Sequence, residues 1–142
     1  MKISSRFTVA VHILSLVHIE RNQTLTSAYI AGSVNTNSVV IRRLISKLKQ
    51  AGFLETHQGS GGIQLLKPLI DITLLDVYRA VEVVEEGELF QMHEDTNINC
   101  VVGANIQSVL EIVLLRAQDA MEAVLANVTM DDIVSGIVQQ NG

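Results

Sequence analysis

A mainly α-helical fold with one small β-hairpin is predicted for this chain of 142 residues. Apolar residues make up 48% of the sequence and aromatic residues only 4%, so the core must be built from Leu, Ile, Val and Ala, which favours packed helices. Most apolar segments repeat with helical spacing, and only residues 53–57 and 62–66 have the pattern of short strands. The length suits one domain, or one small domain with an appended element.

Three helices are expected before the hairpin. Residues 5–20 carry apolar side chains along two lines, which predicts a helix buried between others. Thr26 is placed to cap a short helix over residues 27–33, and Asn37 is placed to cap a third helix that runs to about residue 51. The inward stripe of the third helix is predicted at Ile41, Leu44, Ile45 and Leu48.

The second half is predicted to hold a helix over residues 73–84, an acidic loop over 85–99 and a short terminal helix capped by Thr129. Between the last two, residues 104–128 form the longest periodic segment, about 36 Å long as a helix. One small domain cannot easily bury so long an apolar stripe, so pairing with a second copy is expected. The expected dimer interface is Ile106, Val109, Leu110, Val113, Leu114, Ala117, Met121, Val124 and Leu125, with Glu111, Gln118, Asp119 and Glu122 on the opposite, polar face.

Charge divides the chain near its one proline, Pro68. Residues 1–67 hold eight Lys or Arg and two acids, a net charge of +6, whereas residues 68–142 hold two Arg and thirteen acids, a net charge of −11. Such asymmetry indicates a nucleic-acid surface at one end of the molecule, although a solvated basic face without a partner is the alternative. Residues 1–67 are therefore expected to form a DNA-binding domain, and residues 68–142 a linker helix, an acidic loop and a dimerisation helix.

Helix, helix, turn, helix and a glycine-tipped hairpin is the order of a winged helix-turn-helix domain, whose third helix enters the major groove while the hairpin reaches the neighbouring backbone or minor groove. The outer face of the third helix has no acid, and it offers Arg for guanine, Ser and Gln for base edges and Lys for phosphate. Val39 either meets a thymine methyl group or packs back onto Val34. The predicted DNA contacts are Ser38, Val39, Arg42, Arg43, Ser46, Lys47, Lys49 and Gln50 from this helix, and His57, Gln58 and Ser60 from the hairpin.

Other classes of protein fit the sequence less well. The glycines at 59–62 lack the Lys-Ser/Thr and the helix that a phosphate-binding loop needs, and no carboxylate pair stands beside a nucleophile, so an enzyme is not expected. No run of about 18 uncharged apolar residues occurs, which argues against a membrane span. The single cysteine fits a reducing compartment, and a cytoplasmic protein is expected.

Several motifs resemble the Rrf2 family of bacterial winged-helix regulators, the IscR/NsrR/CymR type. They are MKIS at 1–4, VIRRL at 40–44, LKQAGFL at 48–54, GSGG at 59–62 and LLDV at 74–77, so the resemblance covers nearly the whole chain. It implies a homodimer that binds double-stranded DNA through its winged helices and pairs through the long C-terminal helix. Many relatives place an Arg before the wing glycines where this chain has Gln58, which implies either a weaker grip of the wing on DNA or the reading of a different groove feature.

The resemblance also bears on cofactors. Relatives that bind a [2Fe–2S] cluster use three cysteines in the loop before the dimer helix, whereas this chain has only Cys100 there, so no such cluster and no other cofactor is expected. His93, Glu94 and Asp95 fit a solvated acidic loop better than a metal site. Cys100 is either a buried small hydrophobe or a redox or electrophile sensor, and the nearby acids are expected to raise its pKa.

The expected function is that of a sequence-specific DNA-binding transcriptional regulator, a repressor that acts as a homodimer. Responses to redox conditions and to a small-molecule effector between the winged domain and the dimer helix both stay open. The alternative is a dimeric protein-interaction adaptor built on a winged-helix domain.

Overall fold

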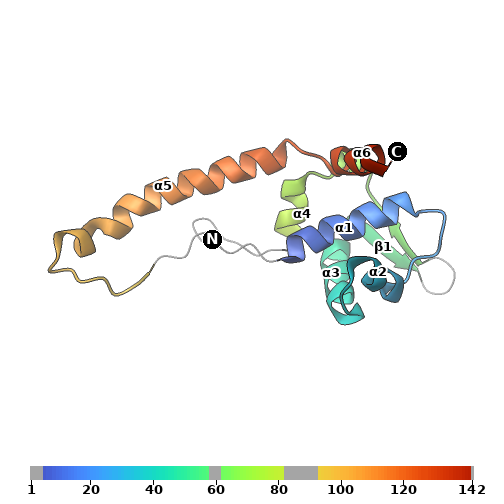
Figure 1. Cartoon of the computed structure of the whole chain (residues 1–142), viewed down its shortest axis with the longest axis horizontal. Helices are drawn as coiled ribbons and strands as arrows, with labels where there is room; N and C mark the ends of the chain where they lie inside the picture. Colours follow the sequence, from blue (N-terminus) through green and yellow to red (C-terminus); the bar gives the residue numbers. More distant parts are fainter. Residues whose placement is uncertain (1–4, 58–61, 82–92, 142) are drawn as a thin grey trace.

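The computed structural model describes residues 5–57, 62–81 and 93–141, which form six α-helices, a 3-10 turn and a two-stranded hairpin (Figure 1). Helices α1 to α4, the hairpin and α6 lie together, and the long helix α5 extends away from them (Figure 1). The elements are α1 (Ser5–Ile19), α2 (Ser27–Val34), α3 (Ser38–Gln50), β1 (Leu54–His57), β2 (Gly62–Leu65), η1 (Leu69–Asp71), α4 (Leu74–Val81), α5 (Val101–Ala126) and α6 (Met130–Asn141).

The helix-turn-helix is held by the two predicted capping residues. The Thr26 hydroxyl accepts a hydrogen bond from the N–H of Tyr29 at 3.1 Å, and the Asn37 carbonyl oxygen Oδ1 accepts one from the N–H of Val40 at 3.0 Å. Between them, Asn35 ends α2 in the left-handed conformation, with φ of 66°. Asn tolerates this conformation better than most residues. The turn is therefore only three residues long, which fixes α3 relative to α2.

The hairpin packs with one face on the helices. Leu54 pairs with Leu65 and Thr56 pairs with Ile63 in an antiparallel register. Leu54 and Ile63 are buried, so the alternate side chains of this small sheet complete the core. Gly62 has φ of +64°, and a Cβ there would lie 3.0 Å from the backbone oxygen of Leu25, so any other residue at this point would be strained. The hairpin tip, with Gln58 and Ser60, lies outside the described residues.

One hydrophobic core joins the elements on both sides of Lys67. The predicted inward stripe of α3 is confirmed, because all four of its side chains are buried. Helix α4 adds Val77, Tyr78 and Val81, and α6 adds Met130 and Val134. The Thr129 hydroxyl accepts from the N–H of Asp132, so the predicted cap of the terminal helix is also present.

The long helix differs from the prediction at its start and in its polar face. It begins at Val101, a few residues before the expected start, and it includes Gly103, where any Cβ would collide with the Asn97 carbonyl. Gln118 was placed on the polar face, yet only 5% of it is exposed, because this part of the helix lies against α4. Its side-chain amide donates to Glu122, which in turn accepts a salt bridge from Arg79 at 3.2 Å.

No helix among the described residues is long and apolar enough to cross a membrane.

Candidate nucleic-acid interface

The outer face of α3 carries the predicted DNA contacts. Val39 is 47% exposed, which supports the outward orientation over packing against Val34. Because the apolar stripe of α3 faces the core, the polar residues between its members are presented on the opposite side. Of these, Ser38 and Lys47 are half-buried, and the exposed ones are Arg42, Arg43, Ser46, Lys49 and Gln50.

The positive charge of this face is not neutralised within the described part of the chain. Arg42 donates to the Ser38 hydroxyl one turn earlier at 3.4 Å, and none of Arg42, Arg43 and Lys47 forms an ion pair with an acid among the described residues. Exposed cations without acidic partners attract a polyanion, because phosphate charges release counterions when they are neutralised. The face is thus electrostatically suited to a nucleic-acid backbone.

Two polar contacts organise the base of the wing. The Lys49 ammonium donates to the Thr56 hydroxyl at 2.8 Å and so links the end of α3 to β1. The His57 ring nitrogen Nε2 lies 2.9 Å from the Glu55 carboxylate. Lys49 therefore lies between α3 and the base of the wing. Thr56 was missed from the sequence, since nothing in its spacing identifies it as the partner of a lysine on another element.

The wing contacts are only partly described. His57 is exposed at the end of β1, where the strand leads into the hairpin tip. The other two predicted wing residues, Gln58 and Ser60, lie outside the described residues, and their contact with DNA stays a prediction.

The predicted dimer face of α5 divides into two groups. Val109, Val113, Ala117 and Val124 are exposed, and Val113 and Val124 leave 55% and 64% of their surface open to solvent. The second group is half-buried and consists of Ile106, Leu110, Leu114, Met121 and Leu125. Ile112 and Val102 are also exposed and were not predicted, because they lie beside the stripe that the periodicity picks out.

The position of Cys100 decides between two alternatives for its surroundings and corrects one expectation about its pKa. It is exposed at the start of α5, so it is not a buried small hydrophobe. The neutral thiol makes no capping hydrogen bond, but backbone N–H groups of Gly103 and Val102 stabilise the thiolate and lower the pKa of Cys100. The expectation that Glu94 and Asp95 raise this pKa is wrong, because neither carboxylate contributes to the shift, and the two backbone N–H groups decide its direction.

The cluster of the iron–sulfur relatives does not fit this chain. Three thiolates cannot come from a chain with one cysteine, and a homodimer would bring only two. Within residues 5–57, 62–81 and 93–141, no three His, Cys, Asp or Glu side chains are grouped so that they could hold a metal ion, and this includes His93, Glu94 and Asp95.

Comparison with known proteins agrees with this geometry. Residues 3–136 match the Rrf2 family, described as iron-dependent transcriptional regulators. A Bacillus subtilis (strain 168) protein named as an HTH-type transcriptional regulator, YwnA, is 46% identical over 133 residues, which cover 94% of this chain and 97% of that protein.

Solved structures show the same fold. A crystal structure described as a DNA-binding protein has 43% identity and a TM-score of 0.71, and the match covers 91% of this chain and 98% of that one. A crystal structure from Lactobacillus plantarum, described as that of a transcriptional regulator, has 27% identity and a TM-score of 0.80, over 95% of this chain and 91% of that one. The helix order, the hairpin and these matches lead to one assignment: the chain belongs to the Rrf2 family of winged-helix transcriptional regulators.

Proposed function

We propose that the protein is a homodimeric, sequence-specific DNA-binding repressor that reads the major groove with α3. The observation that carries this proposal is the exposed, acid-free face of α3 beside the hairpin. Arg42 and Arg43 would donate to guanine edges or phosphates, Ser46 and Gln50 would meet base edges, and Val39 would meet a thymine methyl group. The wing would contact the adjacent backbone through His57, Gln58 and Ser60.

Pairing of two copies through α5 would allow both copies of α3 to bind the same duplex. An exposed row of valines on a helix that extends from the body is covered most simply by the same row on a second copy, related by a two-fold axis. Two copies of α3 would then read two half-sites about 34 Å apart on one side of the duplex. The acidic half of each chain would be repelled by DNA, so the dimer would approach with its winged helices first. A dimer bound across a promoter represses by excluding the polymerase.

The proposal is tested by selecting duplexes bound by the protein and measuring affinity for the best one as salt is varied. Replacing Arg42 or Arg43 by Ala is expected to weaken binding to that duplex about 10- to 100-fold, because a bidentate contact to a base contributes about 1–3 kcal/mol. Arg116→Ala, which removes the same charge from α5, is the matched control and should leave affinity within about threefold, with dimerisation checked by ultracentrifugation.

Two results would count against DNA recognition by α3. One is unchanged affinity in both arginine variants. The other is a binding affinity that does not fall with salt, since each neutralised phosphate adds to the salt dependence of a DNA binder. The second result would favour the protein-interaction adaptor.

We propose that the protein works without an iron–sulfur cluster. We propose as a second candidate function a redox response through Cys100. The exposed position of Cys100 favours it, because a peroxide can reach the thiol. Two such thiols, one from each protomer, would lose two electrons and two protons to the peroxide and form a disulfide. Operator affinity measured before and after peroxide tests this. An effect that persists in Cys100→Ser would rule out the thiol as its origin.

A further inference from the structure

Helices α1 and α6 line an open cavity of about 460 Å³ that plays no part in the proposed DNA contacts or in the pairing of α5. Its middle is apolar, with Leu16 from α1 and Ile133 and Ile137 from α6. His12 and Glu20 also line it, and since they are eight residues apart on one helix, about 12 Å separates them along the axis. The cavity thus has a length and a mixed polar and apolar lining that suit a small amphipathic molecule.

The polar groups near His12 already have partners. The His12 ring nitrogen Nε2 shares a hydrogen bond of 2.9 Å with the Ser33 hydroxyl. Ser15, which also lines the cavity and is buried, donates its hydroxyl to the Val11 carbonyl at 2.8 Å. At this end of the cavity, no enclosed side-chain nitrogen or oxygen lacks a partner among the described residues.

Glu20 is different. Its oxygen Oε1 accepts a hydrogen bond from the Tyr29 hydroxyl at 2.9 Å, but Oε2 is enclosed and has no hydrogen-bond partner among the described residues. An enclosed carboxylate oxygen without a donor is costly, and such an atom calls for a missing partner. Glu20 itself lines the cavity, and the terminal torsion of Glu is broad, so a rotation of the carboxylate would be needed to bring Oε2 to a ligand there.

The charge of the lining selects the ligand. Glu20 is the one acid among the described residues of the cavity, and no Lys or Arg is found with it. A carboxylate in a mostly apolar site favours a cation that can also donate a hydrogen bond, because charge-assisted bonds are the strong ones. An anion would meet Glu20 unfavourably, and a neutral molecule would leave the carboxylate charge unbalanced.

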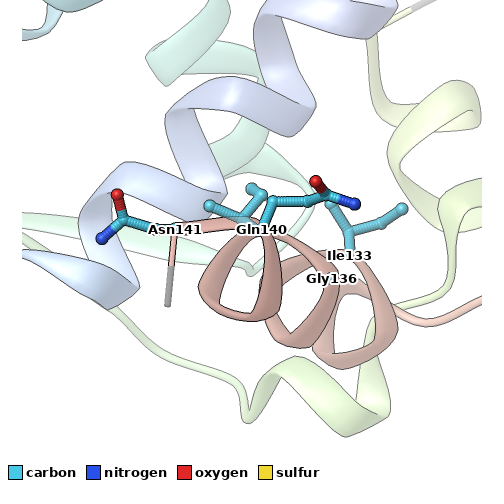
Figure 2. A pocket seen from close by; sticks show the side chains of 5 residues that line it. Ile133, Gly136, Gln140 and Asn141 are labelled. Carbon is cyan, nitrogen blue, oxygen red and sulfur yellow. The ribbon is translucent and has the colours of Figure 1, made fainter.

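A second hollow continues the apolar surface along α6. It is lined by Gly136, Gln140 and Asn141 together with the same two isoleucines, and Figure 2 shows Ile133, Gln140 and Asn141 projecting from one side of the helix. Its polar groups are neutral amides. It can extend the contact with an apolar tail, but it offers no charged group, so the head of a ligand belongs at Glu20.

We propose that the α1–α6 cavity is an effector site for a small organic cation, an ammonium group attached to an apolar body. The ammonium donates to Glu20, and the body packs on Leu16, Ile133 and Ile137. Helix α1 packs on α2 and α3, and α6 directly follows α5. A ligand between α1 and α6 would therefore change the orientation of α3 relative to α5. This regulatory consequence, unlike binding itself, rests on the proposed DNA-binding function.

Calorimetric titration of the full chain with hexylammonium, hexanol and hexanoate tests the site in the absence of DNA. Hexylammonium is expected to bind about tenfold or more tightly than hexanol, which shares its apolar body, and hexanoate is expected not to bind. Glu20→Gln should remove the preference for the cation, whereas Glu111→Gln, the same change on an exposed acid of α5, should keep it.

A second variant guards against loss of the fold. Ile137→Trp places a large side chain at a partly exposed position of the cavity wall and leaves Glu20 intact, so it should weaken hexylammonium and hexanol alike. Circular dichroism and thermal unfolding establish that both variants fold. Equal affinity of the parent for cation and alcohol would overturn the proposal, as would a folded Glu20→Gln variant that still prefers the cation.

The same titration separates this inference from the proposed function. Arg42→Ala and Arg43→Ala should bind hexylammonium as the parent does, because neither residue lines the cavity. If the parent binds the cation but not DNA, the effector site stands and the DNA-binding function fails. If operator affinity in the parent does not change at saturating hexylammonium, the cavity binds the cation but does not regulate DNA binding.

Discussion

Helices α3 and α5 both carry apolar side chains along one side, but those of α3 are buried and several of those of α5 are exposed. In α3 the stripe is buried and the cations between its members are exposed. In α5 the valines at 109, 113 and 124 are exposed, whereas Gln118 is buried against the body of the same chain. A surface helix of a complete domain has the first arrangement, and a helix that keeps its apolar side for another chain has the second.

The apolar stripe of α3 is covered within one chain, whereas the valines at 109, 113 and 124 of α5 are not. The polar contacts of Gln118, Glu122 and Arg79 attach α5 to α4 without using its valine row, which leaves that row free. The proposed function needs both properties. Helix α3 must be held by its buried stripe so that it can read DNA, and α5 must keep an exposed apolar row for pairing with a second copy.

The largest effect is expected from Val113→Glu, in the middle of the exposed row of α5. In a dimer paired through this row, each copy would bury an unpaired carboxylate, so the dimer dissociation constant should rise at least about 100-fold. Operator affinity should fall with it, because a monomer reads one half-site. Sedimentation as a function of concentration measures the first quantity, and fluorescence anisotropy with labelled duplex measures the second.

The control is a change of charge on the same helix but outside the row. Glu111→Gln alters an exposed residue of the same helix and should leave the dimer intact. A Val113→Glu protein that sediments as the parent does would mean that the valine row is not the pairing surface.

The fold and the reading face could be predicted from the sequence for a physical reason. The stripe of α3 and the caps at Thr26 and Asn37 are local signals, set by helical periodicity and by side chains that bond a few residues away. Contacts between elements carry no such signal. Neither the Lys49–Thr56 bond, nor the burial of Gln118, nor the cavity between α1 and α6 follows from spacing along one segment. The sequence also left open whether Cys100 is buried, because adjacent valines indicate burial only when something packs against them.

A smaller effect is expected in α3, where Ile41 is fully buried and Val39 is half exposed on the same helix. Ile41→Ala should lower the free energy of unfolding by about 2–5 kcal/mol, because it leaves a cavity in the core. Val39→Ala should change it by less than about 0.5 kcal/mol, since little packing is lost at an exposed position. Urea unfolding followed by circular dichroism gives both values. Equal destabilisation by the two variants would mean that α3 is not seated as described.

The smallest effect concerns the start of α5, where Cys100 stands in the capping position that Asn37 occupies in α3. The N–H groups of Gly103 and Val102 favour the thiolate and lower the pKa of Cys100 in the folded chain. The thiolate is the species that reacts with iodoacetamide, so the rate of alkylation should reach half its maximum at a lower pH than in the urea-unfolded chain. A group with a lowered folded pKa stabilises the fold above its unfolded pKa, and this contribution disappears as pH falls through the folded value. The unfolded protein is its own control, and identical alkylation profiles would mean that the helix N-terminus does not act on this thiol.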